Sequence, residues 1–124
     1  PTLWRQALLS NEIEGVEVLG GCHHELDPWF VGADSKASLA RALVGLGAYV
    51  AAAGDSTLDG PMLEVATLPL VVPDRRGSAP LMEAMQGVAR ARHLVVDDRR
   101  FAGVSPIHAS ELIATLVAQA APTC

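Results

Sequence analysis

Short apolar runs alternate with stretches of helical periodicity along most of the chain. Runs of this kind between turn-forming residues are typical of strands buried on both faces. The predicted strands are Tyr49–Ala53, Leu68–Val72 and His93–Val96. The predicted helices are Thr2–Leu9, Lys36–Leu46, Ala79–Arg92 and a last helix opened by Ser105 and Pro106. This alternation predicts an α/β fold with a parallel sheet and right-handed crossovers.

The helix predicted to begin at Lys36 has a recognisable start, face and end. Ser35 is a suitable N-cap, because its hydroxyl could accept a hydrogen bond from the first turn. Gly45 and Gly47 follow the helical pattern and are typical of a helix end. Apolar side chains recur between these ends at helical spacing, so we expect them to face the sheet. They are Leu39, Leu43 and Leu46.

The beginning of the chain has a different pattern. Two short apolar segments, Val16–Leu19 and His23–Leu26, flank the pair Gly20-Gly21, which predicts a β-hairpin. Pro28 is expected to end the second strand, because proline cannot donate a hydrogen bond to a neighbouring strand. We therefore divide the chain into residues 1–33, which hold the hairpin, and residues 34–124, which hold the α/β pattern.

Composition narrows the class of protein. The chain has 124 residues, of which 50% are hydrophobic and 4% aromatic, so one aliphatic core is expected. A net charge of −5 argues against nucleic acid as a partner. No apolar run approaches the length of a membrane span and the start lacks a signal-peptide pattern, so no membrane partner is expected. Cys22 and Cys124 show no metal or redox spacing, which favours a reduced, cytoplasmic setting.

Two carboxylates follow the first predicted strand within a segment rich in turn formers. Gly54 is expected to let the chain turn sharply at the carboxyl end of that strand, where open α/β sheets bind their ligands. If Ser56 to Leu63 form a helical turn, Asp55 and Asp59 lie on one side of it. Two carboxylates there could hold a magnesium ion directly or through water. A strand followed by an Asp-capped turn is the simpler alternative.

The string Gly-Asp-Ser-x-x-Asp-x-Pro-Met-Leu at residues 54–63 resembles the last motif of the haloacid dehalogenase (HAD) superfamily of phosphatases. The segment Ser35–Leu43 stands where that family has an upstream lysine at the start of a helix. The resemblance extends over roughly residues 16–116 and is to the sugar-phosphatase branch, whose α/β cap ends in a hairpin. It implies a catalytic role for Lys36, magnesium binding by Asp55 and Asp59, and a substrate contact by Ser56.

The first motif of that family, an apolar strand followed by Asp-x-Asp, has no match in this sequence. The nearest segment is His93–Arg100, in which Arg99 and Arg100 stand two places after Asp97 and Asp98. Arginine can neither coordinate magnesium nor accept a proton in this role. We therefore interpret Asp97 and Asp98 as strand-end and turn carboxylates. The second motif of the family, a phosphate-binding serine or threonine ahead of the cap, also has no candidate in the right order.

The resemblance thus implies the carboxyl-terminal half of a magnesium-dependent HAD phosphatase for phosphate monoesters such as sugar phosphates. Its fold would be a partial doubly wound parallel sheet, preceded by a hairpin from the end of a cap. Because the aspartate nucleophile is missing, we expect the chain alone to be inactive. On this interpretation we expect the amino-terminal half to be on another chain, cut away or lost, and a start at Pro1 rather than methionine suits a processed or cut piece.

Two other interpretations remain open from the sequence. One is a non-catalytic HAD-like binding or interaction module, in which another chain or a second copy covers an apolar sheet edge. The other is a generic doubly wound domain, such as a nucleotide-binding one, in which the spacing of Asp55 and Asp59 is accidental. The sequence lacks a glycine-rich phosphate loop, which makes this last interpretation the less favoured one.

Overall fold

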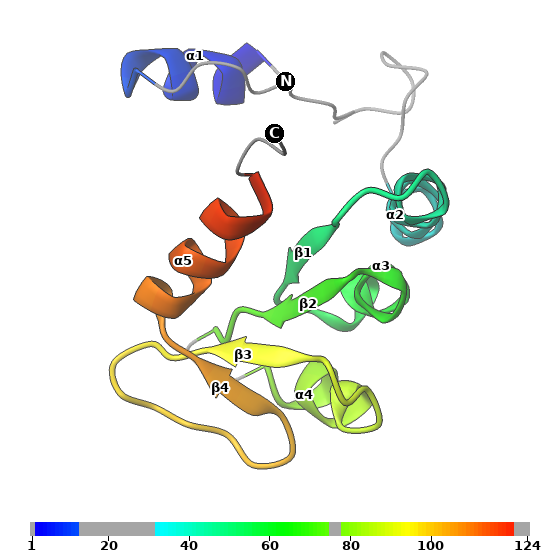
Figure 1. Cartoon of the computed structure of the whole chain (residues 1–124). Coiled ribbons are helices and arrows are strands. Elements are labelled where there is room, and N and C mark those ends of the chain that lie inside the picture. Colours follow the sequence, from blue (N-terminus) through cyan, green and yellow to red (C-terminus); the bar gives the residue numbers. More distant parts are fainter. Residues whose placement is uncertain (1, 13–31, 75–77, 121–124) are drawn as a thin grey trace. The chain divides into compact units, whose positions relative to one another are not determined.

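The computed structural model describes residues 2–12, 32–74 and 78–120 (Figure 1). The chain divides into two compact units, Pro1–Gly32 and Ala33–Cys124. The first unit contains helix α1 (Thr2–Ser10), as the sequence predicted. The predicted hairpin, with Cys22 and both of its flanking segments, lies outside the described residues, as does Cys124. None of the described helices is long and apolar enough to cross a membrane.

The second unit is built on a four-stranded sheet. Its strands are β1 (Ala51–Gly54), β2 (Leu68–Val71), β3 (Arg92–Leu94) and β4 (Ser105–Ile107). They lie side by side in the order of the sequence, and every neighbouring pair is parallel. The α/β class and the parallel pairing of the first two predicted strands are therefore confirmed. All four strands have their carboxyl ends at the same edge of the sheet.

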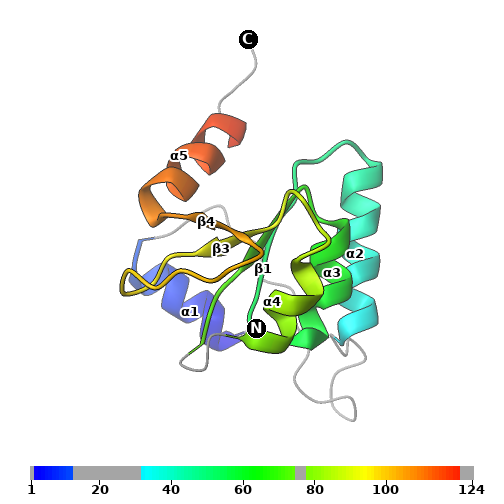
Figure 2. The same cartoon turned by 90° about the horizontal axis from the view of Figure 1, so that it is seen from below.

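Helices connect and flank these strands. They are α2 (Ala33–Gly45), the one-turn 3₁₀ helix η1 (Thr57–Asp59), α3 (Gly60–Val65), α4 (Ala79–Met85) and α5 (Ala109–Ala120). Helices α2, α3 and α4 lie on one side of the sheet, and α5 lies on the other (Figures 1 and 2). Three consecutive helices on one face are characteristic of one half of a doubly wound sheet.

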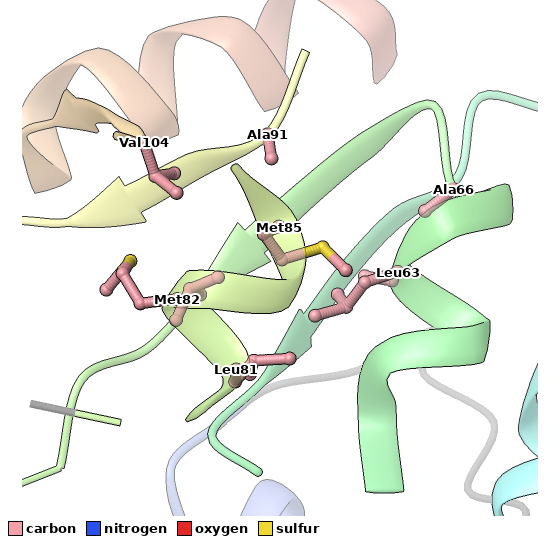
Figure 3. Packing of buried hydrophobic residues seen from close by; sticks show 9 residues of the cluster. Leu63, Ala66, Leu81, Met82, Met85, Ala91 and Val104 are labelled. Atoms are coloured by element: carbon pink, nitrogen blue, oxygen red, sulfur yellow. The ribbon is translucent and has the colours of Figure 1, made fainter. Parts of the chain in front are cut away.

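The core lies between the sheet and helices α3 and α4. Leu63 of α3 and Leu81 and Met85 of α4 are fully buried and gather over the strands (Figure 3). Side chains alternate between the two faces of a strand, so Ala52 and Val71 point into this cluster. Ala51 and Ala53 of β1 fall on the opposite face and are exposed. Burying each Leu or Met side chain contributes about 2 kcal/mol, so this cluster is the main source of stability.

Helix α2 differs from its prediction in both its start and its buried face. It begins at Ala33, so Ser35 lies inside the first turn and is not the N-cap. The three leucines expected to face the sheet are 48%, 38% and 84% exposed: Leu39, Leu43 and Leu46. The buried face instead carries Ala37 and Ala40, because α2 packs against α3 and not directly on the sheet. Small side chains allow the two helices to approach closely.

The predicted end of α2 is correct. The helix ends at Gly45, and Gly47 has a φ of +85°. The N–H of Gly47 donates to Val44, and the N–H of Ala48 donates to Leu43. These two bonds form a Schellman motif, which requires a left-handed residue at the position of Gly47. The motif directs the chain away from the helix and into β1.

Two predicted helices in the last part of the chain have other bounds in the structure. Helix α4 ends at Met85, so the predicted helix Ala79–Arg92 is too long, and Arg92 begins β3. Ser105 and Pro106 do not open a helix: they belong to β4, which pairs with β3 and buries Ile107. Proline is tolerated there because β4 is the outer strand of the described sheet and the missing N–H faces away from β3. The last helix begins only at Ala109.

Candidate functional site

The site forms where β1 ends and the chain turns into η1 and α3. The predicted helical turn from Ser56 to Leu63 is confirmed, as a 3₁₀ turn continued by an α-helix. Pro61 stands in the first turn of α3, where its missing N–H costs nothing. This compact connection holds Asp59 directly above the end of β1, four residues after Asp55.

Gly54 is needed for a different reason from the one predicted. Its φ lies outside the left-handed region, so the turn does not require the conformational freedom of glycine. A Cβ at this position would instead lie 2.4 Å from the Cβ of Asp59 and 2.8 Å from its carboxylate. Real Cβ atoms do not approach other atoms so closely. The last residue of β1 must therefore lack a side chain for the Asp59 carboxylate to occupy its place.

Asp59 is buried and fully engaged through both of its carboxylate oxygens. Only 7% of the residue is exposed. The backbone N–H of Asp55 donates to Oδ2 at 3.2 Å, and the ammonium of Lys36 donates to Oδ1 at 2.8 Å. Although Asp59 stands at the N-cap position of α3, its side chain makes no capping hydrogen bond there. The carboxylate instead closes the turn before η1, through the N–H of Asp55, so the simpler alternative of a strand followed by an Asp-capped turn stays open.

Lys36 reaches the site from a distant part of the sequence. It stands in the first turn of α2, 23 residues before Asp59, and its ammonium forms a direct ion pair with the carboxylate. The helix dipole disfavours a cation in a first turn, and the buried carboxylate offsets that cost. Two residues to which the resemblance assigns roles in one site, Lys36 and Asp59, therefore meet directly in the fold. The Lys36 side chain as a whole is 37% exposed.

The surroundings of Asp59 favour its charged form. Burial removes water and by itself would raise the pKa of Asp59, but hydrogen bonds outweigh this effect. The donors are the Lys36 ammonium and the backbone N–H groups of Asp55 and Ser56, and the positive charge of Lys36 adds to them. As a result, the pKa of Asp59 lies below its ordinary value of 3.8.

This lowered pKa makes a testable contribution to acid stability. A carboxyl group whose pKa is lower in the folded state stabilises the fold above its unfolded pKa, and the contribution is lost as the pH falls through the folded value. We expect Asp59→Asn to reduce the pH dependence of the unfolding free energy below pH 3.8. Urea unfolding between about pH 6 and about pH 2 measures it. Glu83→Gln, at an exposed position in α4, is the control. An unchanged slope in Asp59→Asn would contradict the assignment.

Asp55 and Ser56 have more open surroundings than Asp59. The Asp55 side chain is exposed at the carboxyl end of β1, and Ser56 is half-buried. The resemblance implies the same role for Asp55 and Asp59, as magnesium ligands, but the geometry gives them different surroundings. Asp55 is accessible to an ion, whereas Asp59 is already held by Lys36 and by the backbone.

The donor set at this site suits magnesium only in part. Carboxylate oxygens are the ligands that Mg²⁺ prefers, and the ion commonly keeps several waters beside one or two carboxylates. Asp55 fits such a site as a direct ligand and Asp59 as a ligand through water. The described residues contain no group of three or more His, Cys, Asp or Glu side chains that could hold a metal. Further ligands would have to come from water, substrate or another polypeptide segment.

The segment after β3 has the geometry of a tight turn. Asp97 and Asp98 have φ values of 53° and 57°, and the N–H of Arg99 donates to the carbonyl of Val96. Two central residues with positive φ are characteristic of a type I′ hairpin turn. The interpretation of these aspartates as turn carboxylates is confirmed, although β3 itself already ends at Leu94.

Comparisons with family models, with curated proteins and with solved structures found no match for this chain. The resemblance to HAD phosphatases therefore remains a prediction that rests on the residues quoted for it.

Proposed function

We propose that this chain supplies the charge-neutralising part of a magnesium-dependent HAD-type phosphatase that acts on phosphate monoesters such as sugar phosphates. The observation that carries the proposal is the ion pair between Lys36 and the buried Asp59 at the carboxyl end of β1. Transfer of a phosphoryl group requires positive charge around its oxygens and a nucleophile in line with the leaving group. Lys36 supports the first requirement.

In this proposal Asp59 positions Lys36 and does not bind substrate. It accepts one hydrogen bond from the ammonium and leaves two N–H groups of Lys36 for phosphoryl oxygens. Asp55 would hold the magnesium ion, which neutralises phosphoryl charge when it is bound. Ser56 would lie at the rim of the same site. A lysine fixed on its partner before the ligand arrives needs little reorganisation.

The sheet supports the idea that a second half completes this site. Ligands of doubly wound sheets bind at the carboxyl edge, where the order of the strands reverses. Strand order here runs in one direction from β1 to β4, so a reversal could only lie beyond β1. Within the described residues, β1 pairs with β2 alone. A strand carrying the missing Asp-x-Asp would bring its aspartates beside Asp55 if it paired with this edge.

We expect the purified chain to bind magnesium weakly and not to hydrolyse sugar phosphates. Weak binding follows from one or two available carboxylates, and inactivity follows from the missing nucleophile. Nuclear magnetic resonance titration with magnesium should shift amide signals of residues 54–59 in the native chain but not in Asp55→Asn. Asp97→Asn, in the turn after β3, is the matched control and should leave the titration unchanged.

A phosphatase assay with magnesium and a panel of sugar phosphates completes the test. Turnover by the isolated chain that depends on Asp55 would show that a nucleophile had been overlooked. Turnover that appears only after a separate chain carrying Asp-x-Asp is added would support a split enzyme. Magnesium shifts that are equal in the native chain and in Asp55→Asn would remove the metal from the proposal.

The second candidate function is a non-catalytic HAD-like module that binds a ligand or another chain. It is favoured by a specific observation: the sequence contains no Asp-x-Asp at any position. Such a module would keep the Lys36–Asp59 pair as a structural or ligand-binding feature. It would bind magnesium or a phosphate ester in the titrations above and remain inactive in the presence of every added partner.

A further inference from the structure

The edge of β1 that faces away from β2 carries backbone groups without a partner in the described part of the chain. The carbonyl oxygens of Val50 and Gly54 accept hydrogen bonds from the chain of β2. Backbone groups of a parallel strand point to one neighbour and then the other in alternate residues, so the N–H and C=O groups of Ala51 and Ala53 point away from β2. Among the described strands, β1 pairs with β2 alone. Beyond these alanines, the N–H of Asp55 already donates to a carboxylate.

Helix α2 stands past this same edge. Helices α2, α3 and α4 form a row along one side of the sheet, and α2 is the outermost of them, beyond β1 (Figure 1). It packs against α3 and η1 and not directly on the sheet. The row of helices therefore extends further than the strands do. A strand next to β1 would lie beneath α2, and no described strand occupies that position.

The side of α2 that faces this position is apolar. Three leucines recur at helical spacing and form one stripe along the helix: Leu39, Leu43 and Leu46. Successive residues are about 100° apart around a helix, which places Lys36 between this stripe and the alanines packed on α3. Lys36 reaches the Asp59 carboxylate over the end of β1, so the stripe beyond it faces the level of the sheet past β1. The leucines are exposed because no described strand continues the sheet beneath them.

These two features specify what fits at the edge. The backbone groups of β1 require an extended strand, and the leucine stripe requires apolar side chains at every second position of that strand. The side chains of Ala51 and Ala53 are exposed on the other face of the sheet, so the alternate positions can be polar. A second copy of this chain does not meet the requirements. Pairing of β1 with β1 about a two-fold axis would place both α2 helices on the same side of the sheet, over the same strip.

We propose that the free edge of β1 and the leucine stripe of α2 form one docking surface for a single β-strand of another polypeptide, with its apolar residues facing α2. Hydrogen bonds to the backbone of Ala51 and Ala53 provide affinity, and the leucine stripe selects the apolar side chains. The surface does not rest on the proposed phosphatase function, because it uses none of the side chains assigned to that function. It fits a strand that carries Asp-x-Asp and one that does not.

A synthetic eight-residue peptide of alternating valine and lysine tests this surface in the absence of magnesium. We expect saturable shifts of the Ala51 and Ala53 amide signals and slower hydrogen exchange at both, because their N–H groups become hydrogen-bonded. Leu43→Glu should weaken the affinity about tenfold or more, since it places a carboxylate against the valines. Ile113→Glu is the matched control, at an exposed apolar position of α5 on the opposite side of the sheet, and should leave the affinity unchanged (Figure 2).

Methylation of the peptide backbone tests the hydrogen bonds directly. In an extended peptide the valine N–H groups all point to one edge and the lysine N–H groups to the other. Methylation of the set that faces β1 should abolish binding, and methylation of the other set should leave binding intact. The sensitive set also shows whether the docked strand runs parallel or antiparallel to β1.

Four results would overturn the proposal. Two are an equal effect of the two methylated peptides and an affinity that a folded Leu43→Glu variant leaves unchanged, with Leu39→Glu in its place if the amide spectrum shows Leu43→Glu to be unfolded. The others are slow exchange of the Ala51 and Ala53 amides in the chain alone. If it is independent of concentration, the chain covers its own edge, and if it increases with concentration, a second copy does. The peptide contains no aspartate, so its binding and the outcome of the phosphatase assay are independent results.

Discussion

Replacing Gly54 by alanine is expected to destabilise the protein by about 2–3 kcal/mol and to break the ion pair between Lys36 and Asp59. The added methyl group would lie 2.4 Å from the Cβ of Asp59, so one of the two must move. The obstructing atoms belong to a short buried side chain and not to the far end of a flexible one. Moving Asp59 away from β1 removes the carboxylate that holds the Lys36 ammonium.

Urea unfolding measures the stability loss, and Gly45→Ala is the matched control. A Cβ on Gly45 meets no atom within 4 Å, and this glycine has a negative φ within α2. Alanine is favoured over glycine in helices by up to about 1 kcal/mol, so the control variant should be as stable as the native chain or more stable. The contrast separates the close contact at Gly54 from a general effect of removing glycine.

A double-mutant cycle identifies the atom responsible for the loss. In an Asp59→Gly background, the side chain that meets the new methyl group is absent. The cost of Gly54→Ala should then fall to less than half of its cost in the native chain, which is the coupling expected of residues in direct contact. Equal costs in the two backgrounds would show that Gly54 is required for another reason.

Replacing His93 by leucine is expected to cost about 3 kcal/mol, although leucine is more apolar and of similar size. His93 is fully buried in β3, among the core side chains. Its Nδ1 lies 2.8 Å from the carbonyl oxygen of Val104, and the N–H of Phe101 points at its Nε2. A carbonyl only accepts and an N–H only donates, so the ring must be neutral with its proton on Nδ1.

The two hydrogen bonds of His93 hold the segment between β3 and β4 in place. This connection contains no helix. Leucine would leave the buried Val104 carbonyl without a partner, at about 1–3 kcal/mol, and would also remove the acceptor of the part-buried Phe101 N–H. It would also lose the edge-to-face contact with the Phe101 ring, whose centroid is 5.5 Å from that of His93. These contacts give His93 a structural role in this segment.

Urea unfolding and amide hydrogen exchange measure this effect together. We expect a lower unfolding free energy in His93→Leu and faster exchange at Phe101 and its neighbours. His108→Leu is the control, because His108 is exposed and surface substitutions change stability by about 0.5 kcal/mol or less. Equal stability of the two variants would contradict the structural role of the buried ring.

The sequence determined the class of fold and pointed to the residues of the candidate site. Apolar runs located β1 and β2, since strands buried on both faces leave a continuous apolar signature. The meeting of Lys36 with Asp59 was predictable from topology. A helix that runs antiparallel to the following strand begins near the carboxyl end of that strand, so distant residues converge without any local signal.

Only the tertiary structure decided which contacts each of these residues makes. Local sequence patterns do not indicate the surface on which a helix packs. The leucines of α2 have helical spacing, yet the residues buried by close packing on α3 are Ala37 and Ala40. Ser105-Pro106 is equally compatible with a helix start and with an edge strand, and pairing with β3 selects the strand. The same applies to Asp55 and Asp59, which the motif treats alike. The carboxylate of Asp59 occupies the space beside Gly54, so Asp59 is the buried partner of Lys36, whereas Asp55 remains exposed.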